Sequence, residues 1–148
     1  MEEDQVKELK KIKKHRLNVI IIVILIVFVL GVAAFSYFRI TTEGRLILRQ
    51  GKNVKLALDM MDIEYYRENK SVYNPNSPNG LSSGVEQQLY DIVGETGEIE
   101  VLSYDTAERR ILYMIYEEEK YRVIYKYDDV NGDQWKVDYL VTIFDYSY

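Results

Sequence analysis

The strongest hydrophobic pattern in the chain is an uncharged run over residues 17–38, between Arg16 and Arg39. Its strongly polar side chains, Asn18 and Ser36, lie near the two ends, and its centre consists of Ile, Val, Leu and Phe. A helix of these 22 residues is about 33 Å long, which is enough to cross the hydrocarbon core of a bilayer. The pattern therefore predicts one transmembrane helix over residues 17–38.

Two other interpretations of this run are less favoured. A helix buried in a soluble core needs a protein large enough to surround it, and the rest of the chain is short and polar. A cleavable signal would use the small residues 32–34, but the apolar run exceeds the usual signal core of about 7–15 residues. An uncleaved signal anchor is the favoured interpretation.

Basic residues on the two sides of the run predict its orientation. Six precede it closely and three follow at wider spacing: Lys7, Lys10, Lys11, Lys13, Lys14 and Arg16, then Arg39, Arg45 and Arg49. Because basic residues stay in the cytoplasm, residues 1–16 are expected to form a cytoplasmic basic tail and residues 39–148 an extracytoplasmic domain of a plasma-membrane protein. The tail also allows attraction to anionic membrane lipid.

The helical period continues beyond the membrane run, without a proline, and predicts a helix over about 43–70. Its apolar stripe consists of Ile47, Val54, Ala57, Leu58, Met61 and Tyr65. The charged side chains are expected mostly on other faces: Lys52, Lys55, Asp59, Asp62, Glu64, Arg67 and Glu68. Such a stripe is ordinarily core, here against a sheet, although use of the stripe by a partner stays open.

Residues 71–84 contain both prolines and many Asn, Ser and Gly residues, and they predict a loop. The next apolar residues return to a helical period. Val85, Leu89 and Ile92 share one helical face before Gly94, which predicts a short helix over residues 85–93.

From residue 98 the hydrophobic period changes from 3.6 to 2, which is typical of strands. The predicted strands are residues 99–104, 110–117, 121–127 and 135–144. Their short connections predict an antiparallel meander. One face is apolar in the last two strands: Tyr121, Val123, Tyr125 and Tyr127, with Trp135, Val137, Tyr139, Val141 and Ile143. We therefore expect an α+β fold, in which a single N-terminal transmembrane helix continues into an amphipathic helix packed on a four-stranded antiparallel meander.

Composition narrows the function classes. Residues 39–148 hold 13 basic and 20 acidic side chains, a net charge of −7, which argues against nucleic acid as a partner. The absence of cysteine removes disulfides, thiol catalysis and thiolate metal sites. About 110 residues are enough for one domain with a moderate core.

No motif in the sequence indicates catalysis. His15 is the only histidine and lies beside the membrane run, and GxxxxGK[ST] and GxGxxG are absent. We therefore expect a non-enzymatic protein with no catalytic residue, no bound cofactor or metal, and no small-molecule substrate.

Two acidic segments are interpreted as turns. Asp129, Asn131 and Asp133 resemble the first half of a calcium loop, but Gln134 and Leu140 stand where such a loop needs Gly and Glu. A solvated hairpin turn is preferred. The acidic run of residues 117–119 is likewise expected to be a charged turn.

Tyrosine occurs 14 times. Four of these residues are interpreted as cross-strand packing partners: Tyr113, Tyr121, Tyr125 and Tyr139. Tyr37 is expected at the outer membrane interface. A carbohydrate or peptide platform made of tyrosine rings stays an open alternative.

The layout of basic tail, membrane helix, amphipathic helix, loop and meander resembles type IV pilins and pseudopilins. Two segments are similar to the helix end of many pilins: Ala57-Leu58, and then Ile63-Glu64-Tyr65-Tyr66-Arg67-Glu68-Asn69-Lys70-Ser71-Val72-Tyr73. The sequence departs from them in two ways. Residues 15–18 stand where the prepilin peptidase glycine is found, and residues 19–35 lack the usual glutamate. The resemblance implies a permanently anchored component of an envelope assembly or secretion apparatus, with protein partners.

A second resemblance is to membrane-anchored cystatin-like or PepSY-like domains, in which a helix packs on an antiparallel sheet. The sequence of residues 132–139, GDQWKVDY, looks like the closing strand of these domains. This resemblance implies an extracytoplasmic binding or regulatory module.

Overall fold

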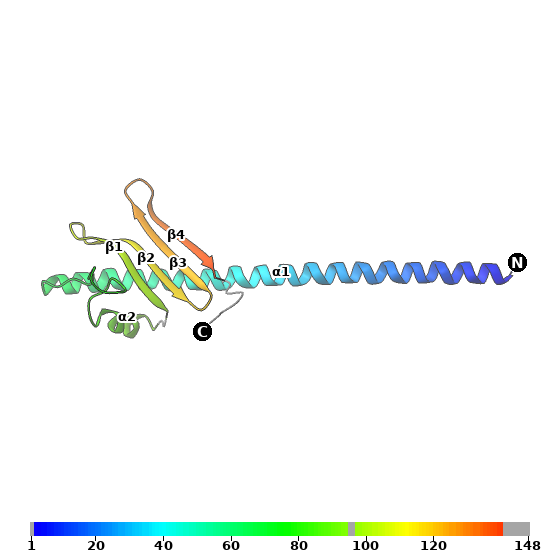
Figure 1. The fold of residues 1–148 in the computed structure, drawn as a ribbon, viewed down its shortest axis with the longest axis horizontal. Helices are drawn as coiled ribbons and strands as arrows, with labels where there is room; N and C mark the ends of the chain where they lie inside the picture. Colours follow the sequence, from blue (N-terminus) through cyan, green and yellow to red (C-terminus); the bar gives the residue numbers. More distant parts are fainter. Residues whose placement is uncertain (1, 95–96, 141–148) are drawn as a thin grey trace, which may run out of the picture. The chain divides into compact units, whose positions relative to one another are not determined.

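The computed structural model describes residues 2–94 and 97–140, with only the backbone of residues 2–10 and 12. The chain divides into two compact units, residues 1–41 and residues 42–148, which are described in turn. Figure 1 shows the elements: α1 (Glu2–Arg67), α2 (Val85–Val93), β1 (Glu98–Asp105), β2 (Arg110–Glu118), β3 (Tyr121–Asp128) and β4 (Gly132–Tyr139).

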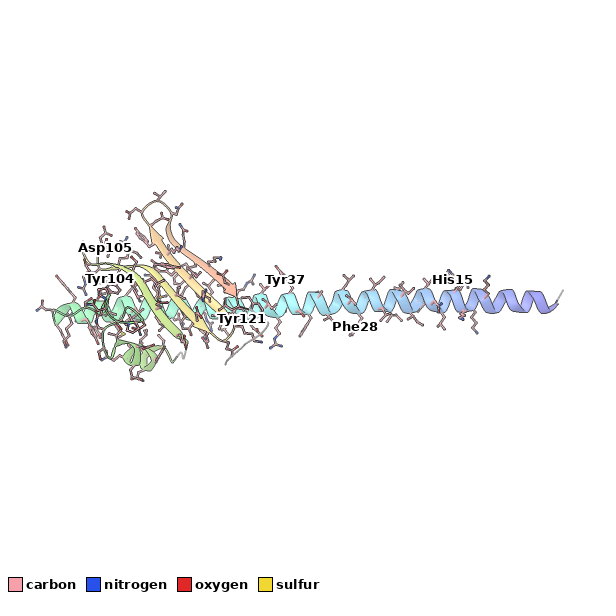
Figure 2. All side chains as sticks on the ribbon, viewed as in Figure 1. His15, Phe28, Tyr37, Tyr104, Asp105 and Tyr121 are labelled. Carbon is pink, nitrogen blue, oxygen red and sulfur yellow. The ribbon has the colours of Figure 1, made fainter. Side chains whose placement is uncertain are left out.

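The described part of the first unit belongs entirely to helix α1. Its apolar side chains are exposed: Phe28, for example, is 68% exposed and projects away from the helix in Figure 2. The most apolar 18-residue window has a mean hydropathy of 3.3, and none of it is buried within the described residues. By length and composition this helix is compatible with a single-pass membrane anchor.

The sheet of the second unit has the strand order β1-β2-β3-β4, and all three pairs are antiparallel. Strands adjacent in sequence are adjacent in the sheet, so the sheet is an open meander (Figure 1). The predicted α+β fold class is confirmed.

The last strand begins earlier than the pattern predicts. β4 starts at Gly132, directly opposite Asp128, because Gly132 takes a left-handed φ of 66° that returns the chain to the sheet. The described strand ends at Tyr139. The remainder of the predicted strand, residues 141–144, lies outside the described residues.

The core of the second unit lies between one row of α1 side chains and the inner face of the sheet. The predicted helix stripe forms the helical side of this core: Ile47, Val54, Ala57, Leu58 and Met61 are buried and Tyr65 is partly buried. The strands contribute Ile99, Val101, Ile111, Met114, Tyr116, Tyr121, Val123 and Tyr125. Gly51 of α1 lies against Val123, where an added Cβ would stand 3.0 Å from Cγ1. Helix and sheet therefore approach closely at this point.

Asp62 is an exception to the expectation that the charged side chains of this helix lie mostly on other faces than the buried stripe. Asp62 is only 6% exposed. It follows Leu58 by one turn and Val54 by two, so helical geometry places it in the buried row. The carboxylate is accommodated there because Arg109 and Tyr104 each donate a hydrogen bond to it.

Helix α1 ends at Arg67, three residues before the predicted limit of about 70. Asn69 takes a left-handed φ of 55°. The N–H of Lys70 donates to the carbonyl of Tyr65 at 2.9 Å, and the N–H of Asn69 donates to that of Tyr66 at 3.0 Å. This pair of bonds is a Schellman cap, which ends the helix.

The loop after α1 covers one edge of the sheet. Tyr73 and Leu81 form an isolated antiparallel bridge within the loop. The N–H of Val101 in β1 donates to the carbonyl of Asn79 at 2.9 Å. The backbone edge of β1 therefore has a partner at this position.

Helix α2 covers the residues predicted for the short helix, but its buried row differs from the apolar face expected from the sequence. Val85 and Leu89 are buried, whereas Ile92 is 61% exposed, so the three residues that were expected to share one helical face are not buried together. Val93 packs against the core instead. The buried row is therefore spaced i, i+4, i+8, and Gly94 ends the helix with a left-handed φ of 67°.

Candidate functional site

A hollow of about 570 Å³ lies in the second unit, between the C-terminal part of α1 and the strands β2 and β3. Its size falls in the usual range of ligand pockets. We call it the groove, and its lining residues are Lys55, Asp59, Asp62, Ile63, Tyr66, Glu108, Arg109, Arg110, Tyr125, Tyr127 and Asp133. The groove therefore combines charged groups with tyrosine rings.

One end of the groove is built around the buried carboxylate of Asp62. Arg109 Nη2 donates to Asp62 Oδ1 at 2.6 Å and to its backbone carbonyl at 3.1 Å. The Tyr104 hydroxyl donates to Asp62 Oδ2 at 2.8 Å, and Figure 2 shows Tyr104 beside Asp105 at the end of β1. Burial, and next this hydrogen bond, raise the pKa of Tyr104 above its usual range. The hydroxyl thus stays protonated and serves as a donor.

Arg109 occupies a strained position in the turn between β1 and β2. Its φ is 53°, in the left-handed region that side chains rarely adopt. The guanidinium carbon lies 4.6 Å from the ring centroid of Tyr66 on α1, in cation–π geometry. The turn is therefore connected to the helix by both a salt bridge and a ring contact.

The other end of the groove is built around the ring of Tyr125. Its hydroxyl donates to Asp133 Oδ1 at 2.7 Å, and burial, followed by this bond, raises its pKa above the usual range. Lys55 Nζ lies 4.9 Å from the ring centroid and 2.7 Å from Asp59 Oδ2. Also lining the groove, the Arg110 guanidinium lies 4.2 Å from the ring centroid of Tyr127.

The positive charges that line the groove are all paired within the chain. Each of its three cations lies over a tyrosine ring and within salt-bridge distance of a carboxylate, Glu108 being the partner of Arg110 at 3.3 Å. A ligand would therefore meet preformed pairs of donors and acceptors beside ring faces, which suits polar molecules with some apolar surface.

A second hollow, of about 510 Å³, has an acidic lining that includes Glu86, Glu98, Glu100 and Glu117. Two of these side chains have protein partners: Glu86 accepts a bond from Asn79, and Glu117 pairs with Arg122. The hydroxyl of Tyr90 lies nearby, 3.1 Å from Glu86 Oε1 and 2.6 Å from the carbonyl of Gly97. Burial, followed by Glu86, raises the pKa of Tyr90 to about 12.

The segment that resembles a calcium loop forms the turn between β3 and β4. Asp128 Oδ1 accepts from the N–H groups of Val130 and Asn131 at 2.9 and 2.6 Å, and Gln134 binds the other oxygen at 2.8 Å. These bonds, chiefly those from Asn131, lower the pKa of Asp128. Among the described residues no group of three His, Cys, Asp or Glu side chains is placed to hold a metal ion.

The other residues singled out from the sequence lie apart from the groove. His15 is exposed on α1 in the first unit. Glu119 lies in the turn between β2 and β3 with a φ of 53°. The tyrosines expected to pack across strands do so: the rings of Tyr121 and Tyr139 are 5.1 Å apart, and Lys126 lies 4.7 Å from the ring of Tyr113.

The outer face of α1 in the second unit is also apolar. Leu56, Met60 and Ile63 are 59%, 60% and 60% exposed, and helical spacing places them on one face, opposite the buried row. Ile63 also lines the groove. We call these three residues the outer helix face. The sequence pattern predicts the buried stripe, but whether another segment covers this second apolar face depends on the tertiary structure.

Comparison of the chain with models of protein families, with curated proteins and with solved structures finds no match.

Proposed function

We propose that this chain is a single-pass membrane protein and a non-enzymatic, pilin-like component of an envelope assembly or secretion apparatus. In this proposal residues 1–16 lie in the cytoplasm, residues 17–38 cross the plasma membrane, and residues 39–148 lie outside it. Lipid and other subunits of the apparatus are its partners.

The observation that carries the proposal is the exposure of the apolar helix in the first unit. In the described residues 17–38, every Ile, Leu, Val and Phe side chain is at least 45% exposed. Each such residue near the centre of a bilayer favours insertion by roughly 0.3–0.6 kcal/mol. In water the same surface would promote aggregation, whereas lipid covers it.

The proposed orientation predicts opposite accessibility for cysteines placed in the two ends of this cysteine-free chain. Lys11→Cys and Val130→Cys alter exposed positions, the second being 91% exposed in the turn between β3 and β4. We expect a membrane-impermeant maleimide to label Val130→Cys in intact, wall-stripped cells, and to label Lys11→Cys only after the membrane is opened. Labelling of Lys11→Cys in intact cells, with protection of Val130→Cys, would contradict the proposed orientation and indicate the opposite one.

The outer helix face supports the assembly role. Its three apolar side chains form a row on a helix whose opposite row is already buried by the sheet. A continuous apolar row of this kind is typical of a surface that contacts a protein partner. The face therefore fits a helix that packs against neighbouring subunits.

A photoreactive amino acid at Met60 tests this role. We expect irradiated cells to yield discrete adducts with envelope-machinery proteins, at least fivefold above the yield from the same amino acid at Val130. Both positions are strongly exposed, so exposure alone does not separate them. Equal yields, or recovery of the monomer alone at both positions, would contradict the assembly role.

The alternative is an extracytoplasmic binding or regulatory module of the cystatin-like or PepSY-like kind, and the groove is the observation that favours it. Tyr127 lines the groove but lies outside the outer helix face. Adducts from a photoreactive amino acid at Tyr127, with none from Met60, would favour this alternative over assembly through the helix.

A further inference from the structure

Strand β4 forms one edge of the sheet, and no described segment covers it. At the opposite edge β1 donates to Asn79 of the loop, whereas the described backbone hydrogen bonds of β4 all go to β3 or the turn beside it. We propose that this edge pairs with the same edge of a second copy of the chain, antiparallel and centred on Val137. The two-fold axis of this pair is perpendicular to the sheet, so the parts of α1 that pack on the two sheets run in opposite directions. The pairing therefore concerns the second unit and is tested in detergent, where no shared membrane restrains the two copies.

The peptide groups of β4 that face away from β3 belong to alternate residues. The N–H of Leu140 donates to Lys120 at 2.6 Å, and the register from there to Asp128 opposite Gly132 is unbroken. Since peptide groups alternate in direction along a strand, the even-numbered residues face β3. The N–H and C=O groups of Asp133, Trp135, Val137 and Tyr139 therefore point to the open edge. In the proposed pair they make about six backbone hydrogen bonds between the two copies.

Side chains alternate on β4 in a way that suits a symmetric partner. Trp135, Val137 and Tyr139 lie on the apolar face, and Lys136 and Asp138 on the other. A two-fold axis through Val137 places Lys136 opposite Asp138 of the second copy, twice, in close non-hydrogen-bonded pairs. It also places Trp135 opposite Tyr139, which extends the aromatic row formed by Tyr125 and Trp135, whose rings are 4.7 Å apart.

The neighbouring symmetric registers are less complementary. A two-fold axis through Lys136 places this lysine opposite itself, and like charges directly opposite each other are destabilising. A two-fold axis through Trp135 places Lys136 opposite Gln134 and Asp138 opposite Gly132. Neither charged residue then faces a residue of the other sign. Only the register centred on Val137 matches both charges and both large aromatic rings.

Charges on an edge strand normally prevent pairing with other chains. Lys136 and Asp138 form an exposed ion pair within one chain, at 2.8 Å. A strand without the reciprocal pattern would leave these charges unmatched, whereas a second β4 supplies an acid opposite the lysine and a base opposite the acid. The same two residues thus disfavour pairing of β4 with most other strands and favour pairing with the β4 strand of a second copy.

Disulfide trapping tests the register in the full chain, solubilised in detergent. Two differently tagged copies, one with Lys136→Cys and the other with Asp138→Cys, are co-expressed and oxidised mildly. Directly opposite residues stand about 4.5 Å apart in a non-hydrogen-bonded pair, within the disulfide range. We expect the mixed disulfide to exceed, by at least fivefold, the yields of either cysteine alone and of Val130→Cys. Equal yields would overturn the proposal, as would preferential self-coupling of Lys136→Cys.

Charge reversal gives an independent test. Lys136→Asp and Asp138→Lys each create two like-charged pairs across the interface, and we expect each to weaken dimerisation about tenfold by light scattering. The double variant K136D/D138K restores both opposite pairs and should return to within about threefold of the original chain. An unchanged far-UV circular dichroism spectrum checks that each variant is folded. Single reversals that leave the dimer unchanged, or a double variant as weak as the singles, would overturn the proposal.

Discussion

Replacing Asp62 by alanine is expected to destabilise the second unit by about 3 kcal/mol, because removing one partner of a buried ion pair leaves the other charge uncompensated. Arg109 loses its salt bridge at 2.6 Å, and the Tyr104 hydroxyl loses its acceptor at 2.8 Å. Urea unfolding of the full chain in detergent, followed by the emission of Trp135, measures the change. Trp135 is the single tryptophan of the chain and contacts Tyr125 in the core.

Asp59→Ala is the matched control for Asp62→Ala. Asp59 lies on the same helix and also pairs with a cation, Lys55, at 2.7 Å, but its side chain is 39% exposed. Exposed pairs contribute about 0–1 kcal/mol, so this variant should remain close to the original chain. If the two variants lost the same stability, burial of Asp62 would not be what makes its ion pair important.

Replacing Gly80 by alanine is the second change with a large expected effect. Gly80 has a left-handed φ of 73°, and an added Cβ would stand 1.9 Å from the backbone carbonyl oxygen of Val101. Left-handed strain of about 1–2 kcal/mol and overpacking of about 1–3 kcal/mol act together here. We therefore expect a loss of about 2–5 kcal/mol in the same urea experiment. The carbonyl of Asn79, beside Gly80, accepts a hydrogen bond from the N–H of Val101. Displacement of the loop would weaken this bond, so amide hydrogen exchange in β1 should also be faster in the Gly80→Ala variant.

Gly84→Ala separates the two contributions. Gly84 has a similar φ of 84°, but nothing lies within 4 Å of the position that its Cβ would take. This variant should lose only the strain, about 1–2 kcal/mol. Equal losses at Gly80 and Gly84 would show that the loop moves away from β1 without cost and that the close contact contributes nothing.

The helices and strands follow from local patterns. The period of the chain changes from 3.6 to 2 near residue 98, and this change separates the helical from the strand-forming part. Element ends were less predictable because they depend on single residues in unusual conformations. Asn69 ends α1 early, and Gly132 begins β4 before the apolar alternation reaches Trp135.

The groove could not be predicted in the same way. Asp62 and Arg109 are 47 positions apart, and their pairing requires the turn between β1 and β2 to reach α1. One signal was present: Asp62 continues the row of Val54 and Leu58, so an acid in an apolar row indicates a buried partner. The sequence does not say which of its many cations is that partner.

The sequence by itself determined the membrane-compatible helix, the buried stripe of α1 and the alternation of the strands, because each depends on neighbours within one or two turns or strand repeats. Only the tertiary structure decided which surfaces stay open. Covering one face of α1 leaves Leu56, Met60 and Ile63 exposed, and the loop at β1 leaves β4 as the edge that no described segment covers. These are relations between distant segments, which local periodicity does not encode.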